Sequence, residues 1–160
     1  MLIDGINIRE ALAEDWDEAM EVAWKTFLDF DAKDYSQEGI DNFRKSLDSG
    51  EMKDMFIAGV YKLHVATCGD RIVGIAGMRR TNHISLLFVD ADYQHRGIAR
   101  ELVRSLQSSL PIPVGVKMTV NSAPYAVGFY HKLGFIDTDS ELTSDGIVYT
   151  PMTLLRKVIG

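Results

Sequence analysis

The segment Gln94-His95-Arg96-Gly97-Ile98-Ala99 has the residue types of a phosphate-binding loop. It lies between a hydrophobic strand-like run and a helix expected to begin near Gly97. The first turn of a helix offers unpaired backbone N–H groups and about half a positive charge, so anions are stabilised there. Gly97 lets this backbone approach a ligand closely, and the small Ala99 leaves the turn uncrowded. The segment therefore predicts a site for a phosphorylated ligand.

The charges that follow this loop can be interpreted in two ways. Arg96, Arg100 and Arg104 are spaced four apart, so they share one stripe of the helix and repel one another slightly. A polyanionic ligand would relieve this repulsion; alternatively, Glu101 and solvent screen the arginines on an ordinary exposed face. No Gly-Lys-Ser/Thr follows, and three glycines after a parallel strand are missing, so neither a Walker A loop nor a dinucleotide fingerprint is indicated.

The elements expected before residue 50 are one strand and two amphipathic helices. Ile6 and Ile8 alternate with polar residues, as in a half-buried strand. Ser36 can cap the second helix, which ends near Gly50, and the polar residues 31–35 between the helices are expected to be exposed. The first helix, residues 14–30, carries apolar side chains three or four apart: Trp16, Met20, Ala23, Phe27 and Phe30.

Three strands are predicted next, at residues 61–67, 71–78 and 84–89. Gly69-Asp70 suits a tight turn between the first two. A helix then runs from Gly97 to about Gln107, and two prolines prevent its extension: Pro111 and Pro113.

The remaining elements are a strand, a short helix and two terminal strands. The strand alternates Val116, Met118 and Val120 with polar residues. The helix begins near Pro124 and is closed by Gly134. The terminal strands lie around Phe135 and at residues 147–155, with Ser144-Asp145-Gly146 as a turn before the second. The order predicts a mixed α/β domain whose first half is largely antiparallel and whose helices cover the sheet.

Composition narrows the classes of function. At 160 residues the chain fits a single domain, residues 1–160. Cys68 is the only cysteine, which excludes an intramolecular disulfide and zinc sites built on several thiolates, so a cytoplasmic protein without a metal is expected. No signal-like segment or long apolar run predicts export or membrane insertion. The net charge of -6 argues against broad nucleic-acid binding and mildly favours a cationic substrate.

The loop and two downstream segments resemble the GNAT superfamily of N-acetyltransferases. The family's pyrophosphate loop reads Q/R-x-x-G-x-G/A, and Gln94, Gly97 and Ala99 match its fixed positions. Asn121-Ser122-Ala123-Pro124-Tyr125-Ala126 is similar to the end of the family's fifth strand. Phe129-Tyr130-His131-Lys132-Leu133-Gly134-Phe135 is similar to its F-Y-x-x-L-G-F helix. The resemblance covers nearly the full length and implies about seven mostly antiparallel strands, splayed between the fourth and fifth, with about four flanking helices.

What the resemblance implies for function is transfer of an acetyl group from acetyl-CoA to a primary amine, by direct attack in a ternary complex. The pantetheine arm would lie between the splayed strands, the loop N–H groups would hold the pyrophosphate, and Arg96 or Arg100 would reach the adenosine phosphate. The implied binding residues for coenzyme A are Leu87, Phe88, Val89, Gln94, His95, Arg96, Gly97, Ile98, Ala99, Arg100, Asn121 and Tyr130.

Three residues are catalytic candidates by the same resemblance. Tyr130 matches the tyrosine that protonates the departing sulfur, although its helical spacing also suits a core residue. Asn121 matches a position that contacts cofactor or an ordered water, or it simply forms a turn. His83 takes the position of a glutamate base found in some members; imidazole is a competent base near neutral pH, although a lone histidine at a strand edge is more often structural.

The acceptor and partners are less closely defined. A small-molecule amine or a peptide amine is expected, and homodimers are common among relatives. Four residues could line the acceptor pocket, although helical spacing explains the aromatic ones as core: Trp24, Phe27, Asp31 and Tyr35. The alternative functions are a non-catalytic acyl-CoA-binding sensor or scaffold, and an interaction domain without coenzyme A.

Overall fold

One sheet organises the molecule. In the computed structural model, which describes residues 2–3, 5–80, 82–110 and 117–155, nine strands follow the order β1-β2-β3-β4-β5-β6-β9-β7, with β8 paired to β9. The strands are β1 (Leu2–Ile3), β2 (Ile6–Glu10), β3 (Lys62–Cys68), β4 (Arg71–Met78), β5 (His83–Val89), β6 (Lys117–Ser122), β7 (Ile136–Asp137), β8 (Leu142–Ser144) and β9 (Ile147–Leu155). The α-helices are α1 (Trp16–Thr26), α2 (Gln37–Asp48), α3 (Glu51–Ile57), α4 (Ile98–Ser108) and α5 (Val127–Leu133). This is the expected mixed α/β fold.

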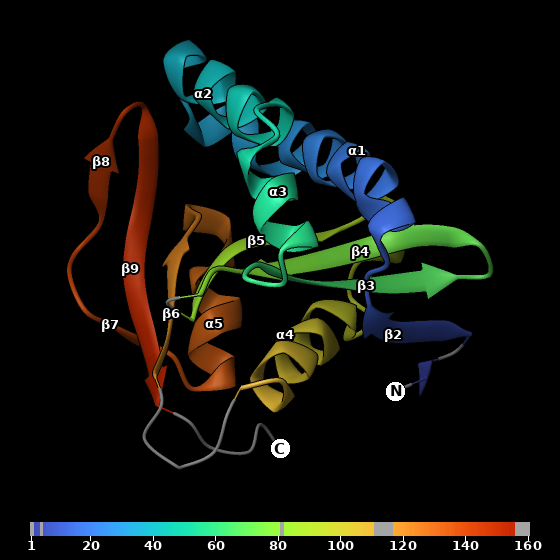
Figure 1. Cartoon of the computed structure of the whole chain (residues 1–160). Coiled ribbons are helices and arrows are strands. Elements are labelled where there is room, and N and C mark those ends of the chain that lie inside the picture. Colours follow the sequence, from blue (N-terminus) through green and yellow to red (C-terminus); the bar gives the residue numbers. More distant parts are fainter. Residues whose placement is uncertain (1, 4, 81, 111–116, 156–160) are drawn as a thin grey trace.

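The helices cover both faces of the sheet, α1 to α3 on one and α4 and α5 on the other (Figure 1). Each face has its own buried cluster. Phe27 and Ile75 belong to the cluster under α1, and Leu102, Leu106 and Met118 belong to the cluster under α4. The apolar stripes of α1 and α4 are therefore buried against the sheet, as their periodicity predicts.

The sheet opens between β5 and β6. These are the only parallel neighbours among the described strands, and they are paired at two positions, His83↔Thr119 and Ile84↔Val120. From Ser85 onward β5 keeps its partner β4, but its pairing with β6 stops at Ile84, while β6 continues beside β9. The splay expected between the fourth and fifth family strands is thus confirmed, and it leaves a free strand edge beside the loop.

The first helix ends differently from the prediction. Instead of one helix over residues 14–30, a 3-10 turn at Ala13–Asp15 precedes α1, and a π-helical turn at Phe27–Asp31 follows it. In that turn the N–H of Ala32 donates to the carbonyl of Phe27, five residues back. Asp31 is buried, and Phe30 on the predicted stripe is only half-buried. The expectation that residues 31–35 are exposed holds only for Lys33, because Asp31 is buried and the other three are half-buried.

Other elements agree with the sequence except for three short ones. The Ser36 hydroxyl accepts a hydrogen bond from the N–H of Gly39 at 3.1 Å and caps α2 as expected. Helix α3 and the edge strands β1 and β8 were not predicted. The expected roles of three residues fall outside the described residues: Pro111, Pro113 and Val116.

The β8–β9 hairpin is attached to the start of α2. The predicted turn at Ser144-Asp145-Gly146 is confirmed with two central residues, Asp145 and Gly146, which both have the positive φ that such a turn requires. The Gly146 carbonyl accepts from the N–H of Ser36 at 3.0 Å, and Tyr35 forms a β-bridge with Ile147. We call this contact the hairpin clasp. It joins segments more than a hundred residues apart.

Gly39→Ala is expected to loosen the hairpin clasp. A Cβ at Gly39 would lie 2.6 Å from the Gly146 carbonyl oxygen, so backbone must move. Overpacking of this kind typically costs about 1–3 kcal/mol, which corresponds to a melting temperature lower by about 5 °C. Gly128→Ala is the matched control, because a Cβ there meets nothing within 4 Å and the helical position favours alanine. Equal or higher stability of Gly39→Ala in thermal denaturation would contradict the close contact.

Candidate active site

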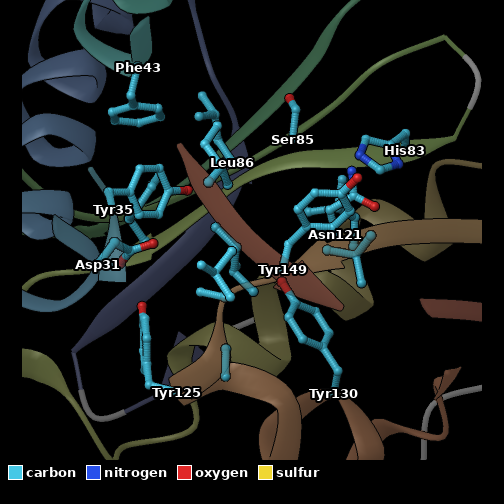
Figure 2. Close-up of a pocket in the computed structure, with 18 of the residues that line it drawn as sticks. Asp31, Tyr35, Phe43, His83, Ser85, Leu86, Asn121, Tyr125, Tyr130 and Tyr149 are labelled. Atoms are coloured by element: carbon cyan, nitrogen blue, oxygen red, sulfur yellow. The ribbon is translucent and has the colours of Figure 1, made fainter. Parts of the chain in front are cut away.

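Two cavities lie on either side of the splay. The first, of about 370 Å³, lies between β5, β6, the β8–β9 hairpin and the end of α1; we call it the sheet cavity (Figure 2). The second, of about 470 Å³, lies between the end of β5, the loop before α4 and α5; we call it the loop cavity. They share four lining residues, Leu87, Tyr125, Ala126 and Tyr130. A ligand in one cavity can therefore meet a ligand in the other beside these residues.

The loop cavity is built to receive an anion. His95 has φ 61° and Gly97 has φ 81°, so the chain turns sharply before α4 and presents the first N–H groups of that helix. A Cβ at Gly97 would meet no protein atom within 4 Å, which leaves space beside this backbone. The residues present thus fit a diphosphate group at the helix start.

The side chains of the loop are partly engaged elsewhere. Gln94 Nε2 donates to the carbonyl of Val89, which ties the loop to the end of β5. The Arg96 guanidinium lies 4.9 Å from the centre of the Tyr93 ring and donates to the Asp92 carbonyl. Ile98 is buried in the core, so its main chain alone can contact a ligand.

The stripe of arginines does not act as one unit. Arg104 forms an ion pair with Glu101 at 3.0 Å, in agreement with the screening interpretation for that residue. Arg100 lines the loop cavity together with His95, Gly97 and Ala99. Arg100 is therefore the arginine of this stripe that the structure brings to the cavity.

The three predicted strand residues divide between the two cavities. Leu87 lines both cavities, and Val89 lines the loop cavity. Phe88 lines the sheet cavity, and its side chain packs in the cluster under α1. Side chains alternate along a strand, so neighbours in sequence face opposite ways.

Tyr130 stands where the two cavities meet. The residue is 4% exposed, and its ring makes edge contacts with Phe129 and Phe135. It is both a core residue and a cavity residue, so the two interpretations of its helical spacing are compatible. Burial, with the charge of Asp31 as a smaller cause, raises the pKa of its hydroxyl. Tyr130 is therefore held as a neutral phenol that can donate a hydrogen bond.

The other two catalytic candidates also line the sheet cavity. His83 lies at the start of β5 with Nδ1 2.8 Å from Thr119 Oγ1. Burial and then the nearby charge of Arg79 lower the pKa of His83 to about 4, so the ring is neutral near pH 7. Asn121 pairs with Pro151 in the sheet and lies near Tyr149 (Figure 2). Asn121 lines the sheet cavity and does not line the loop cavity.

Asp31 is the residue that sequence reasoning undervalued. It is 7% exposed, and its Oδ1 has no hydrogen-bond partner among the described residues. Burial raises its pKa from 3.8 to about 7; the nearby Tyr125 hydroxyl opposes part of this rise, and Asp34 adds to it. The available signal was position, because Asp31 lies four residues after the buried Phe27, on the apolar stripe of its helix.

Of the four residues expected at an acceptor pocket, two reach it. Asp31 and Tyr35 line the sheet cavity, and Tyr35 directs its hydroxyl toward it (Figure 2). Trp24 and Phe27 instead stack on Phe43 in the core. The further lining residues, which were not anticipated at this pocket, include Arg79, Tyr125 and Tyr149.

A third cavity extends the sheet cavity toward α3. It measures about 300 Å³ and shares Phe43, Arg79, Ser85 and Leu86 with the sheet cavity. We call it the side cavity.

Within the described ranges, no helix is long and apolar enough to cross a membrane. No group of three or more His, Cys, Asp or Glu side chains in the same residues is arranged to hold a metal ion.

Comparison with known proteins agrees with this geometry. The model of the acetyltransferase (GNAT) domain matches residues 31–156. A GCN5-related N-acetyltransferase from Rhodopseudomonas palustris has a similar fold, with a TM-score of 0.75 and 23% identity over 96% of this chain and 97% of that one. No curated protein sequence matches the chain.

Two more solved structures share the fold. The PaiA N-acetyltransferase from Thermoplasma acidophilum, in complex with coenzyme A, has a TM-score of 0.70 and 20% identity over 92% of this chain and 97% of that one. The apo form of YjaB from Escherichia coli has a TM-score of 0.68 and 27% identity over 98% of both chains.

Proposed function

The chain belongs to the GNAT acetyltransferase family, and on this premise we propose that it transfers an acetyl group from acetyl-CoA to a primary amine by direct attack in a ternary complex. The observation that carries the proposal is the meeting of the loop cavity and the sheet cavity at Tyr130 and Leu87. A donor on one side and an acceptor on the other would be aligned there, which converts a bimolecular step into a local one. The acceptor is a small-molecule or peptide amine, and a homodimer stays a prediction from the family resemblance.

On the donor side, the proposal assigns the loop cavity to coenzyme A. Acetyl-CoA supplies an acetyl thioester and a thiol leaving group. The N–H groups at the start of α4 would hold its diphosphate, Arg100 would approach a further phosphate, and the free edge of β5 at Leu87 and Val89 would bond to its amide groups. The coenzyme A bound in the similar Thermoplasma fold supports this assignment.

At the junction, the proposal assigns Tyr130 the role of acid. Its hydroxyl donates a hydrogen bond to the departing sulfur and passes its proton there. Because burial raises the pKa of this phenol, a lasting phenolate is unfavourable. The phenol oxygen therefore regains a proton from the acceptor nitrogen as the sulfur takes one, and no net charge stays on Tyr130.

On the acceptor side, Asn121 and His83 remain candidates from the sequence. Asn121 can orient the acceptor or a water through its amide. His83 is neutral at physiological pH and can accept a hydrogen bond from an amine. With a pKa of about 4, its protonated form would lose the proton at once, so His83 is a weak base for an ammonium.

A non-catalytic acyl-CoA sensor would use the same loop cavity. It would have no need of a hydroxyl-bearing side chain at the junction, whereas Tyr130 lines both cavities at the point where they meet. This observation favours the enzyme.

The function is tested by release of free thiol from acetyl-CoA with a panel of alkylamines, amino acids, peptides and arylamines. We expect at least one amine to raise the rate above hydrolysis by about 100-fold, with the acetylated amine identified by mass spectrometry. If acetyl-CoA raises the melting temperature but no amine is acetylated, the sensor is correct instead.

A further inference from the structure

The strongest unassigned feature is the buried carboxylate of Asp31 at the wall of the sheet cavity. The residue is only 7% exposed, and Oδ1 of its carboxylate has no hydrogen-bond partner among the described residues. Figure 2 shows it beside Tyr35 and Tyr125 at one side of the cavity, with His83 and Asn121 at the other. A buried carboxylate oxygen without a partner is costly, and a ligand that donates to it would remove that cost.

The groups that interact electrostatically with Asp31 are one acid and three phenols. Its charge acts on the hydroxyls of Tyr35, Tyr125 and Tyr130, and Asp34 acts on it in turn. In the part of the chain that the structure describes, no lysine or arginine forms an ion pair with Asp31. The charged or titratable groups that line the rest of the cavity are Arg79, His83, Asp145 and Tyr149. A cationic ligand in the cavity would supply the donor that Oδ1 lacks and would stabilise the charged form of Asp31.

We propose that Asp31 receives the ammonium group of the acceptor and then removes its proton, so that the preferred acceptors are strongly basic alkylamines. The proposal rests on the proposed function. Its basis is the position of Asp31 in the sheet cavity, in hydrogen-bond contact with Tyr125 and with its charge acting on Tyr130, two of the four residues at which the cavities meet.

The proposed reaction starts from the protonated acceptor, and every proton and bond in it is accounted for. The acceptor arrives as R-NH₃⁺ and gives one proton to the Asp31 carboxylate. Its nitrogen forms the C–N bond to the acetyl carbon while the C–S bond breaks. The second proton of the nitrogen passes to the Tyr130 oxygen as the Tyr130 proton passes to sulfur. Asp31 then releases its proton to solvent, so the products are the amide, the thiol and one proton.

Asp31 suits this step better than His83 does. An alkylamine with a pKa near 10.4 is neutral in roughly one molecule in 2,500 at pH 7, so it needs a base. The best base holds a proton near the working pH. Burial brings the pKa of Asp31 to about 7, whereas burial and Arg79 lower the pKa of His83 to about 4.

The test is the pH dependence of kcat/KM with the best alkylamine from the thiol-release panel. For the wild type we expect an acidic limb near pH 7, where Asp31 loses its proton. Asp31→Asn should lower kcat/KM by about 100-fold and remove this limb, since general bases contribute about 100-fold or more. Asp31→Glu should restore part of the rate. An arylamine acceptor, which is already neutral at pH 7, should lose less than about tenfold in Asp31→Asn.

Asp34→Asn is the matched control. It removes one negative charge three residues away, at a residue that does not line the sheet cavity. We expect less than a threefold change in kcat/KM and an acidic limb that moves slightly to lower pH, because Asp34 raises the pKa of Asp31.

A second readout needs no turnover. The folded protein holds the Asp31 proton up to about pH 7, but the unfolded chain releases it near 3.8, so this residue lowers stability progressively between those pH values. Asp31→Asn should therefore raise the melting temperature more at pH 8 than at pH 4.5. An equal difference at both pH values would overturn the buried, ionisable state that the proposal needs.

The outcomes separate the two proposals. If the wild type acetylates alkylamines but Asp31→Asn keeps its limb and rate, Asp31 is not the base and only this inference fails. A limb near pH 4 that His83→Ala removes would assign the base to His83. If no amine is acetylated by the wild type, the proposed function fails and this inference fails with it.

Discussion

Tyr130→Phe is expected to lower kcat by about 100-fold while the affinity for acetyl-CoA changes little. The substitution removes one hydroxyl at the junction of the loop cavity and the sheet cavity. The phenylalanine ring keeps the edge contacts with Phe129 and Phe135, so the fold should be preserved. Loss of a general acid typically costs about 100-fold or more, and an interaction made only in the transition state appears in kcat. Steady-state kinetics and the cofactor-induced thermal shift measure the two quantities.

Tyr149→Phe is the matched control for Tyr130→Phe. Tyr149 lines the sheet cavity but not the loop cavity, so this substitution removes the same group from a residue that lines only one of the two cavities. We expect less than a fivefold change in kcat. Unaltered turnover of Tyr130→Phe, or an equal loss in both variants, would exclude Tyr130 as the acid.

Gly97→Glu is expected to abolish the rise in melting temperature that acetyl-CoA produces, with a loss of affinity of at least about 100-fold. Gly97 has φ 81°, which a residue with a side chain rarely adopts, and the added carboxylate would stand in the space beside the first N–H groups of α4. A negative charge there repels a diphosphate and is itself stabilised by the helix start, so it competes for the site. Thermal denaturation with and without acetyl-CoA measures the effect.

Gly59→Glu separates the loss of the site from general strain. Gly59 has φ 82°, and a Cβ there also meets no atom within 4 Å. It lines none of the three cavities described above. The control should therefore lose comparable stability but keep the full thermal shift. A normal shift in Gly97→Glu would refute the placement of the diphosphate.

The fold and the loop could be predicted because their signals are local. Gln94, Gly97 and Ala99 are close in sequence, and the turn that they form depends mainly on glycine and on the start of a helix. The strands beside them alternate clearly, and Asp145-Gly146 determines its turn by backbone preference alone. The conformation of these segments therefore depends mainly on local backbone preferences and less on tertiary contacts.

The acceptor side was harder to predict because its signals are not local. Asp31 is buried in a π-helical turn, which the sequence does not mark, because a regular helical period places both Phe30 and Asp31 near the stripe that contains Phe27. Helix α3 follows Gly50 with φ 81°, without a side-chain cap that would mark its start. The low pKa of His83 comes from burial and from Arg79, and neither can be inferred from the histidine itself.

The hairpin clasp has a consequence for which amines can be admitted. The bonds of Gly146 to Ser36 and of Ile147 to Tyr35 hold two walls of the sheet cavity at a fixed separation. A wall held in this way yields less to a branched or bulky substrate, whereas a slender chain can extend past Arg79 into the side cavity. We therefore expect the enzyme to select by width and to tolerate length.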